Sequence, residues 1–370
     1  MRILFTGGGT AGHINPAIAM ADFIKEKEPQ TEILFVGTKE GMEKNLVPKS
    51  GYDIEFIKVH GFKRSLSLKN IKNLFEIAES IRKTKKIIKR FKPDVAVGTG
   101  GYVTGPVIMA AEQMKIPTLV HESNAFPGVT IRLLSGRVDV VALAMEDAKK
   151  YISGAKRIEI TGNPLRPELF KTNKKAAREK LELDERPVIL VFGGSLGAAY
   201  FNEQVINWIG SMENKDKYQI VMSAGKNNQY ENVKNMLNKQ GLNLEMQKNI
   251  RVLEYIYDMA SALNACDLII GRSGSSVCEM TALGKPSILV PSPNVAGNHQ
   301  EFNARFIENN GAAKVILESE LSGETLKCAV EEILGSNASY SKMSENATKI
   351  GIKDATDRLY GIIKEITGKA

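Results

Sequence analysis

Two glycine-rich loops, each set between an apolar strand-like run and a helix-like segment, constrain this 370-residue chain more than any other feature. The first loop is 7–12 (Gly-Gly-Gly-Thr-Ala-Gly) and the second is 193–197 (Gly-Gly-Ser-Leu-Gly). A strand that turns through glycines into a helix presents free backbone N–H groups and the positive end of the helix dipole, which together suit phosphate. The repetition predicts two anion sites, one in each half of the chain.

Short apolar runs alternate with helix-length segments along most of the chain. The predicted strands are 2–6, 32–36, 54–58, 94–98, 117–121 and 138–142, followed by 187–192, 218–223, 250–253, 267–271, 286–290 and 313–316. The predicted helices include 15–28, which Asn15-Pro16 would start, 68–91 and 103–114. This alternation predicts α/β architecture with parallel sheets, helices on both faces, and ligands at the carboxyl ends of the strands.

The chain is longer than one hydrophobic core usually supports, so two domains are expected. The strand pattern restarts after Asn163-Pro164, where the proline disfavours a continuous helix. We therefore predict an N-terminal domain over 1–163 and a C-terminal domain over 164–353. A final helix, about 354–370, is expected to pack back on the first domain.

The net charge of +8 is concentrated in residues 60–92, which hold eleven Lys and Arg against two Glu. One interpretation is a solvated basic helix whose apolar stripe faces the core. The other is an interfacial segment that contacts anionic lipid. Nucleic acid is disfavoured as a partner, because few aromatic residues are present and no binding motif is recognisable.

The cysteines and the absence of targeting signals favour a cytoplasmic setting. Cys266, Cys278 and Cys328 have no pairing or metal-ligand spacing, and their apolar neighbours predict buried, reduced thiols. Neither a secretory leader nor an apolar stretch long enough to cross a bilayer is found.

The first glycine loop matches Gly-x-Gly-x-x-Gly through Gly7, Gly9 and Gly12, but its context argues against a dinucleotide. A dinucleotide site needs an acidic residue at the end of the next strand, and here that strand runs into Gly37-Thr38. A Walker-type site is also disfavoured, because neither loop ends in Gly-Lys-Ser/Thr.

His13 follows the first loop at the start of a helix. A lone histidine is often structural, but a helix N-terminus favours the neutral ring, so His13 is also a candidate general base.

A further glycine turn, 98–106, follows a neighbouring strand, and two such turns facing one cleft would suit a diphosphate. Its glycines could equally serve a tight turn alone.

Two carboxylates follow strands. Glu122, within His-Glu-Ser-Asn at 121–124, would lie at the ligand-binding rim or cap a helix. Glu279 would accept hydrogen bonds from a ribose diol, or merely complement a helix dipole. Polar groups at 297–304 (Gly-Asn-His-Gln-Glu-Phe-Asn-Ala) could bind sugar hydroxyls. No Asp-x-Asp pair is present to hold a metal-bound diphosphate, so no metal and no other cofactor is predicted.

Seven motifs occur in an order and at separations that resemble the MurG family of bacterial transferases, glycosyltransferase family 28. They are GGGTAGH, GTGGYVTGP, HESN, GNPLR, GGSLGA, RSGSSVCE and GNHQEFNA, and they span nearly the full length. The resemblance implies a GT-B fold, in which two Rossmann-like, doubly wound domains flank a cleft. It also implies inverting transfer of N-acetylglucosamine from UDP-N-acetylglucosamine to the C4 hydroxyl of undecaprenyl-diphospho-N-acetylmuramyl-pentapeptide (lipid I), giving lipid II for peptidoglycan.

The resemblance also implies roles for individual residues. It assigns the sugar nucleotide to Thr10, Ala11, Gly12, Asn124, Arg166, Ser195, Ile256, Glu279 and Gln300. Within this set, Ile256 would present its backbone to uracil, Glu279 would hold the ribose, and Arg166 and Ser195 would meet the diphosphate. The acceptor's diphosphate would lie against Gly9, His13, Gly100, Gly101 and Tyr102. His13 or Glu122 would take the proton of the acceptor hydroxyl.

The family's turn usually reads Arg-x-Gly-Ala-x-Thr-x-x-Glu, whereas Arg272 to Glu279 is one residue shorter, which leaves the contacts of residues 273–276 open.

A lipid-linked acceptor also favours the interfacial interpretation of the basic segment, on the cytoplasmic face of the bacterial membrane. Its expected membrane contacts are Leu66, Leu68, Lys69, Ile71, Lys72, Leu74 and Phe75. Other cell-wall synthesis proteins are further expected partners. A UDP-N-acetylglucosamine 2-epimerase or another GT-B glycolipid transferase remains the alternative.

Overall fold

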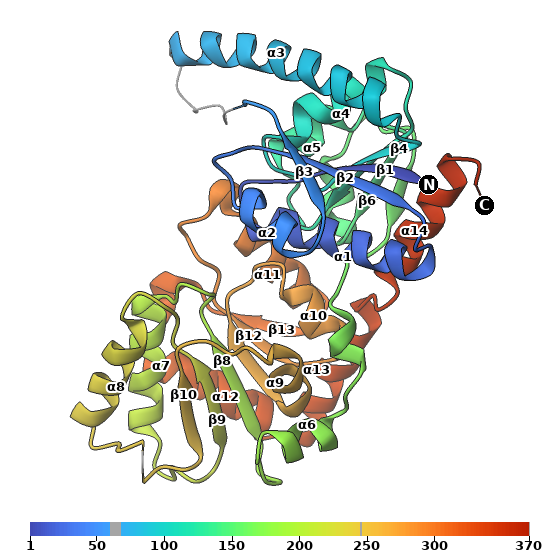
Figure 1. Ribbon diagram of the computed structural model, residues 1–370. Coiled ribbons are helices and arrows are strands. Elements are labelled where there is room, and N and C mark those ends of the chain that lie inside the picture. Colours follow the sequence, from blue (N-terminus) through green and yellow to red (C-terminus); the bar gives the residue numbers. More distant parts are fainter. Residues whose placement is uncertain (60–67, 245, 370) are drawn as a thin grey trace. The chain divides into compact units, whose positions relative to one another are not determined.

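The computed structural model divides the chain into two compact units. Unit 1 comprises Met1–Leu165 together with Ile352–Ala370, and unit 2 comprises Arg166–Gly351. The structure describes residues 1–59, 68–244 and 246–369, and for residues 68–74 it describes the backbone alone. Each unit is built on one parallel sheet (Figure 1).

Unit 1 contains a seven-stranded sheet in the order β3-β2-β1-β4-β5-β6-β7. Its strands are β1 (Arg2–Thr6), β2 (Glu32–Gly37), β3 (Asp53–Phe56), β4 (Val95–Gly98), β5 (Thr118–Glu122), β6 (Val140–Leu143) and β7 (Ile158–Ile160). Its α-helices are α1 (Ala11–Lys27), α2 (Glu43–Lys49), α3 (Leu68–Phe91), α4 (Thr104–Gln113), α5 (Val129–Leu134) and α14 (Ala355–Ile366). Neighbouring strands are parallel throughout.

The two faces of this sheet are buried in separate cores, which explains why its strands read as nearly continuous apolar runs. Ile3 and Phe5 of β1 pack with α1 and α14 on one face. Leu4, between them, packs with α3, α4 and α5 on the other face. Figure 1 shows these two helical layers on either side of the sheet. The C-terminal helix α14 therefore completes the core of unit 1.

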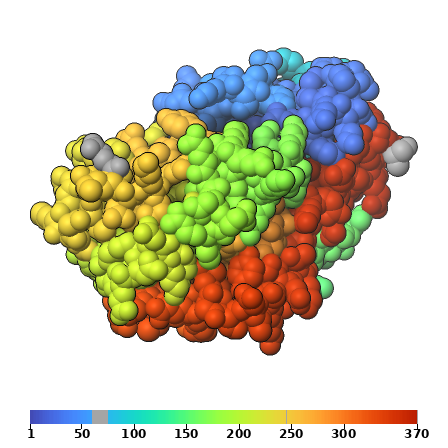
Figure 2. All heavy atoms as spheres, turned by 90° about the horizontal axis from the view of Figure 1, so that it is seen from below, coloured from blue at the N-terminus to red at the C-terminus, as the bar shows by residue number. Residues whose placement is uncertain are grey.

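Unit 2 repeats the construction with six strands in the order β10-β9-β8-β11-β12-β13. Its strands are β8 (Val188–Phe192), β9 (Gln219–Ser223), β10 (Ile250–Leu253), β11 (Leu268–Gly271), β12 (Ser287–Leu289) and β13 (Ala313–Val315). Its α-helices are α6 (Lys174–Lys180), α7 (Ala199–Ser211), α8 (Gln229–Lys239), α9 (Met259–Ala265), α10 (Val277–Ala282), α11 (His299–Asn309), α12 (Gly323–Leu334) and α13 (Asn337–Ile350). Of these, α13 buries only Ala347 and forms part of the exposed surface drawn in orange-red in Figure 2.

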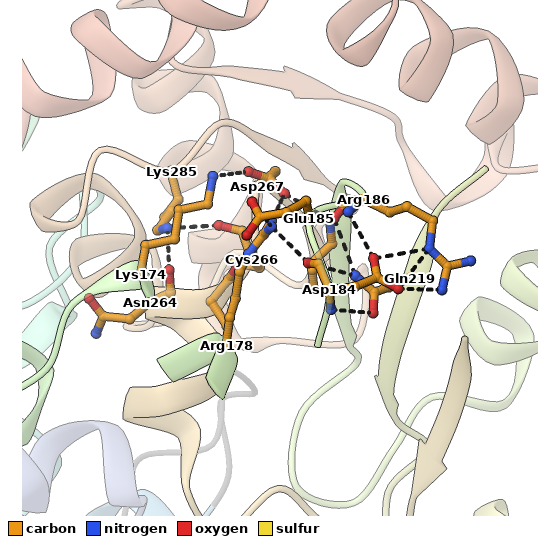
Figure 3. A network of polar contacts seen from close by, with 12 residues as sticks. Lys174, Arg178, Asp184, Glu185, Arg186, Gln219, Asn264, Cys266, Asp267 and Lys285 are labelled. Carbon is orange, nitrogen blue, oxygen red and sulfur yellow. Dashed lines mark hydrogen bonds and ion pairs between the residues drawn. The ribbon is translucent and has the colours of Figure 1, made fainter. Parts of the chain in front are cut away.

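An ionic network centred on the buried Asp267 and Arg178 joins α6 to the amino end of β11 in unit 2 (Figure 3). The Asp267 carboxylate accepts hydrogen bonds from the Arg178 guanidinium at 2.6 Å and from the Val188 N–H at 2.7 Å, and Lys174 also donates to it. The buried ammonium of Lys285 donates to the carbonyl oxygens of Asn264 and Cys266. The network lies at the amino ends of the strands, so it holds the unit together without occupying the ligand-binding edge.

The structure corrects several local predictions. Helix α1 begins at Ala11 rather than at 15, and Pro16 lies inside it. Short elements such as α2, α5 and β7 were not predicted. Only Cys266 is buried, whereas Cys278 is partly exposed and Cys328 is exposed on α12. Cys328 was misjudged because its apolar neighbours in the sequence point to the other face of an amphipathic helix.

Candidate active site

The first glycine loop, 7–12, and the further glycine turn, 98–106, lie at the switch point of unit 1, where the strand order reverses direction. Strands β1 and β4 are neighbours, with Thr6 paired to Gly98, and each leads directly into a glycine turn. In doubly wound sheets, ligands bind beyond the carboxyl ends of the strands at this point. The structure thus brings together two loops that are about ninety residues apart in the sequence.

Direct backbone contact between these loops requires glycine. The N–H of Gly8 donates to the Gly100 carbonyl at 3.3 Å. Gly101 has φ +82°, and a Cβ there would lie 2.2 Å from the Gly8 carbonyl oxygen. A side chain at this position would push the loops apart, so the glycines serve close approach as well as turn geometry.

His13 lies between the two loops in the first turn of α1. Its Nδ1 is 3.1 Å from the Gly8 carbonyl oxygen, and a Cβ on Gly100 would lie 2.7 Å from its ring. Because a carbonyl can only accept, Nδ1 carries the proton in this contact, and the Nε2 of the neutral ring is an acceptor. His13 therefore presents a group that can take a proton, held in place by the loop that precedes it.

The N-terminus of α1 offers donors for an anion. In the described part of the chain, no acceptor is assigned to the N–H groups of Thr10, Ala11 and Gly12. Such groups at a helix start bind phosphate readily. Gly9 differs, because its N–H donates to the Glu43 carboxylate at 3.0 Å. Gly9, against which the acceptor diphosphate was expected to lie, thus has its N–H group engaged by Glu43.

Glu122, at the end of β5, has both carboxylate oxygens engaged. One accepts from the N–H and the side-chain amide of Asn124, each at 2.9 Å, and the other accepts from the Gly128 N–H at 2.8 Å. Only 4% of Glu122 is exposed. These contacts favour a positioning role, in which Glu122 shapes the loop that carries Asn124, over the predicted role as a base.

His121, the neighbour of Glu122, is structural. It is completely buried, and its Nε2 donates to the Gly162 carbonyl at 2.9 Å. Burial lowers the pKa of His121 to about 4, which keeps the ring neutral. His121 therefore joins β5 to the segment that follows β7.

Unit 2 has an equivalent switch point between β8 and β11, where Phe192 pairs with Gly271. Ser195 is exposed in the loop after β8, and its carbonyl accepts from the Lys226 N–H at 3.3 Å. A Cβ on Gly197 would lie 2.3 Å from the Ala224 carbonyl oxygen, so this loop packs closely on the one that follows β9. The second glycine loop is therefore held by its neighbour.

Arg166 and Glu279 form a bidentate ion pair in unit 2. Arg166 Nε donates to Oε1 and Nη2 donates to Oε2, both at 2.8 Å. Glu279 lies in the first turn of α10, with 14% of its side chain exposed against 48% for Arg166. The two residues expected to meet a ribose and a diphosphate are thus paired with each other.

The short turn after β11 is fixed by internal hydrogen bonds. The Ser273 hydroxyl donates to the Gln300 carbonyl at 2.7 Å, and the Gln300 side-chain oxygen accepts from the Ser292 N–H at 2.9 Å. Arg272 is buried, pairs with Glu318 and donates to the Val290 carbonyl. Arg272 and Ser273 therefore hold the turn in place, and among the described residues the Gln300 side-chain N–H groups have no acceptor.

Ile256 lies in the loop after β10. This loop is joined to the loop after β9 by a hydrogen bond from the Gly225 N–H to the Glu254 carbonyl at 3.0 Å. The side chain of Ile256 is buried, with 6% exposed. The flanking Tyr255 and Tyr257 are exposed, and their ring centroids are 5.0 Å apart. This burial leaves the backbone of Ile256 as the group that can face a ligand.

Of the expected membrane contacts, only one has a described side chain. Phe75 lies on α3 and is 74% exposed. Leu66 lies outside the described residues, as do the side chains of Leu68, Lys69, Ile71, Lys72 and Leu74. Within the described part of the chain, no helix is both long and apolar enough to span a membrane.

Sequence reasoning missed Glu43, which lies at the start of α2 beneath the first glycine loop and has no exposed surface. A single glutamate after a strand carries no motif. The only local signal is its position shortly after Gly37-Thr38, where polar residues follow the end of β2.

Comparison with known proteins decides the family. Residues 3–143 match the glycosyltransferase family 28 N-terminal domain, and residues 188–359 match the family's C-terminal domain. The chain belongs to glycosyltransferase family 28. It is a glycosyltransferase, and its two parallel-sheet units are the two domains of a GT-B fold, as the motifs predicted.

Full-length relatives carry one name. A relative from Acetivibrio thermocellus is 45% identical over 368 residues, covering 99% of this chain and 98% of its own length. One from Lactiplantibacillus plantarum is 42% identical, covering 99% of both chains. Each is named UDP-N-acetylglucosamine–N-acetylmuramyl-(pentapeptide) pyrophosphoryl-undecaprenol N-acetylglucosamine transferase.

Solved structures agree on the fold. The crystal structure of Acinetobacter baumannii MurG matches with a TM-score of 0.80 and 27% identity, covering 98% of this chain and 99% of that one. A UDP-GlcNAc 2-epimerase from Neisseria meningitidis, bound to UDP-GlcNAc, matches with a TM-score of 0.66 at 17% identity, covering 99% and 100%. At this identity the epimerase supports the fold alone.

Proposed function

We propose that this glycosyltransferase moves N-acetylglucosamine from UDP-N-acetylglucosamine to the C4 hydroxyl of lipid I, giving lipid II and UDP. The observation that carries the proposal is full-length identity of 45% to a relative named for this reaction. The presence of a phosphate-suited loop at the switch point of each unit supports it, because both substrates carry a diphosphate.

Unit 2 is assigned the donor. Ser195 and the N–H groups of its loop would meet the diphosphate of the nucleotide, and the Ile256 backbone would meet uracil. Glu279 accepts hydrogen bonds from both ribose hydroxyls once it separates from Arg166, and the released guanidinium neutralises diphosphate charge. Gln300 donates to a sugar hydroxyl. Nucleotide binding thus exchanges an internal ion pair for two contacts with the ligand.

Unit 1 is assigned the acceptor's diphosphate and the proton transfer. The unpaired N–H groups at the start of α1 and the adjoining turn at Gly100, Gly101 and Tyr102 suit a diphosphate. The Nε2 of His13 accepts the proton of the C4 hydroxyl as that oxygen attacks the anomeric carbon. The bond to the UDP oxygen breaks in the same displacement, so the anomeric configuration inverts.

A defined assay tests this function. The purified full chain is incubated with labelled UDP-N-acetylglucosamine and a short-chain lipid I analogue, and the product's anomeric configuration is determined. We expect a β-linked disaccharide lipid, with UDP released only when acceptor is present. Epimerised sugar nucleotide formed without acceptor would instead support the isomerase alternative, and its absence together with the absence of product would contradict both.

We also propose that the enzyme acts on the inner face of the membrane as a peripheral protein. A polyprenyl-linked acceptor keeps its diphosphate at the lipid surface, and the basic segment 60–92 combines cationic and apolar residues suited to an anionic surface. The exposed Phe75 ring on α3 supports a contact between this segment of unit 1 and the lipid surface.

A further inference from the structure

The buried carboxylate of Glu43 has no role in the reaction described above, yet it lies directly beneath the first glycine loop. It is completely inaccessible to solvent. A Cβ on Gly8 would lie 2.6 Å from Glu43 Oε1, and one on Gly41 would lie 2.0 Å from Oε2. Glycines on two loops thus leave the space that this carboxylate fills.

Glu43 accepts three hydrogen bonds from two loops. Oε2 accepts from the Gly9 N–H at 3.0 Å, and Oε1 accepts from the Thr38 N–H at 2.9 Å and the Thr38 hydroxyl at 2.7 Å. Hydrogen bonds to a buried charged group are the strong ones, and a buried carboxylate without them would be costly. The carboxylate therefore ties the loop after β1 to the loop after β2.

The connection extends to the further glycine turn, 98–106. The Tyr102 hydroxyl is 3.3 Å from the Thr38 hydroxyl oxygen. Because the single hydroxyl proton of Thr38 is given to Glu43, Tyr102 is the donor in this contact. A hydrogen-bonded path thus runs from Tyr102 through Thr38 to Glu43 and Gly9, and joins all three loops at the carboxyl edge of the sheet.

We propose that Glu43 is a positioning residue that shapes the acceptor-diphosphate site of unit 1. This inference rests on the proposed function. Glu43 holds Gly9 at its positive φ of +86° and occupies its N–H, so an anion is directed to the free N–H groups of Thr10, Ala11 and Gly12. Its negative charge also repels phosphate from the Gly9 side of the loop. The site is then formed before the acceptor arrives.

Glu43→Gln is the principal test, because glutamine has nearly the same shape. Its one oxygen can keep the two donors of Thr38, but its amide N–H₂ then faces the Gly9 N–H, and the loop loses its anchor. We expect Kd and KM for a short-chain lipid I analogue to rise about tenfold or more, while KM for UDP-N-acetylglucosamine changes less than about twofold.

Asp139→Asn is the matched control. Asp139 accepts from the Thr118 N–H at 2.9 Å and the Thr118 hydroxyl at 3.0 Å, the same pair of donors at the opposite, amino-terminal edge of the same sheet. It is more exposed than Glu43 and also pairs with Lys156. This variant should lower the melting temperature and leave both KM values unchanged. If Glu43→Gln behaves in the same way, Glu43 is merely structural and the inference is overturned.

Two further measurements separate the possible failures. If Glu43→Gln does not fold, Thr38→Val is the second variant. It removes the hydroxyl contacts to Glu43 and Tyr102, together with the one that the hydroxyl oxygen accepts from the Gly41 N–H at 3.2 Å. It should raise the acceptor KM selectively, and equal effects on both substrates would contradict the inference. Binding of the lipid I analogue is measured by calorimetry without donor. If the wild-type chain forms no lipid II but Glu43→Gln still binds the analogue about tenfold more weakly than the wild type, the proposed reaction is refuted and this inference is retained.

Discussion

His13 illustrates how one hydrogen bond sets the chemistry of a side chain. The Gly8 carbonyl fixes the proton on Nδ1 and leaves Nε2 as the acceptor. We predict that His13→Ala lowers kcat about a hundredfold or more, as removal of a general base usually does. Near-normal turnover by His13→Ala would remove this residue from the role of base.

The Arg166–Glu279 pair leads to a second prediction for single residues. Glu279→Ala removes the ribose acceptor and leaves Arg166 without a partner, so KM for UDP-N-acetylglucosamine should rise about tenfold or more with a smaller change in kcat. Initial rates at varied donor concentration measure this effect. Glu203→Ala, on the exposed surface of α7, is the control. An unchanged donor KM for Glu279→Ala would contradict the ribose assignment.

At the scale of elements, the docking of α14 on α1 depends partly on Glu28. Its carboxylate accepts from the Tyr360 hydroxyl at 2.6 Å and from Lys364 at 3.0 Å. The hydrogen bond from Tyr360, then that from Lys364, lowers the pKa of Glu28 to about 2 from an ordinary value of 4.5. A carboxylate with a lowered pKa stabilises the folded state above pH 4.5, and this contribution is lost as the pH falls toward 2.

Glu28→Gln should therefore destabilise unit 1 by about 1 to 2 kcal/mol at pH 7, because the charged hydrogen bonds lie near the surface. The difference in free energy of unfolding between Glu28→Gln and the wild type should shrink steadily as the pH falls below 4.5. Thermal unfolding at pH 7 and pH 3 measures it, with the exposed neighbour Glu26→Gln as control. A difference that persists unchanged at pH 3 would show that the ionised carboxylate is not its source.

Helix α3 is the element expected to contact lipid. The double variant Leu74→Asp with Phe75→Asp places two charges on this segment and should abolish most co-sedimentation with anionic vesicles. Phe170→Asp, an exposed aromatic residue in unit 2, is the matched control and should sediment as the wild type does. Unchanged sedimentation of the double variant would exclude this segment as the membrane contact.

The strands were predictable because buried parallel strands are continuous apolar runs, and β10 over Ile250–Leu253 agrees with its predicted bounds. Short elements were not, since three residues at β7 or six at α5 carry too little periodicity. The start of α1 was misplaced because Pro16 resembles a first helical residue. It lies instead in the second turn, where it cannot donate to the Gly12 carbonyl.

For the whole molecule, the sequence predicted two α/β domains and the loops that lie at their switch points, because glycines after strands are visible as a pattern. The pairing of Arg166 with Glu279 and the burial of Glu43 beneath Gly9 were not visible. Both depend on residues that only folding brings together, 113 residues apart in the first case and 34 in the second. Sequence motifs identified the ligand-binding loops, but the internal partners of those loops required the structure.

The most direct test of two loop-built diphosphate sites is a crystal structure of the full chain with UDP. We predict that the diphosphate lies on the loop at Ser195, that uracil meets the Ile256 backbone, and that the ribose hydroxyls bond to Glu279 after it has separated from Arg166. UDP bound elsewhere, with the Arg166–Glu279 pair intact, would contradict the assignment of the donor to the switch point of unit 2.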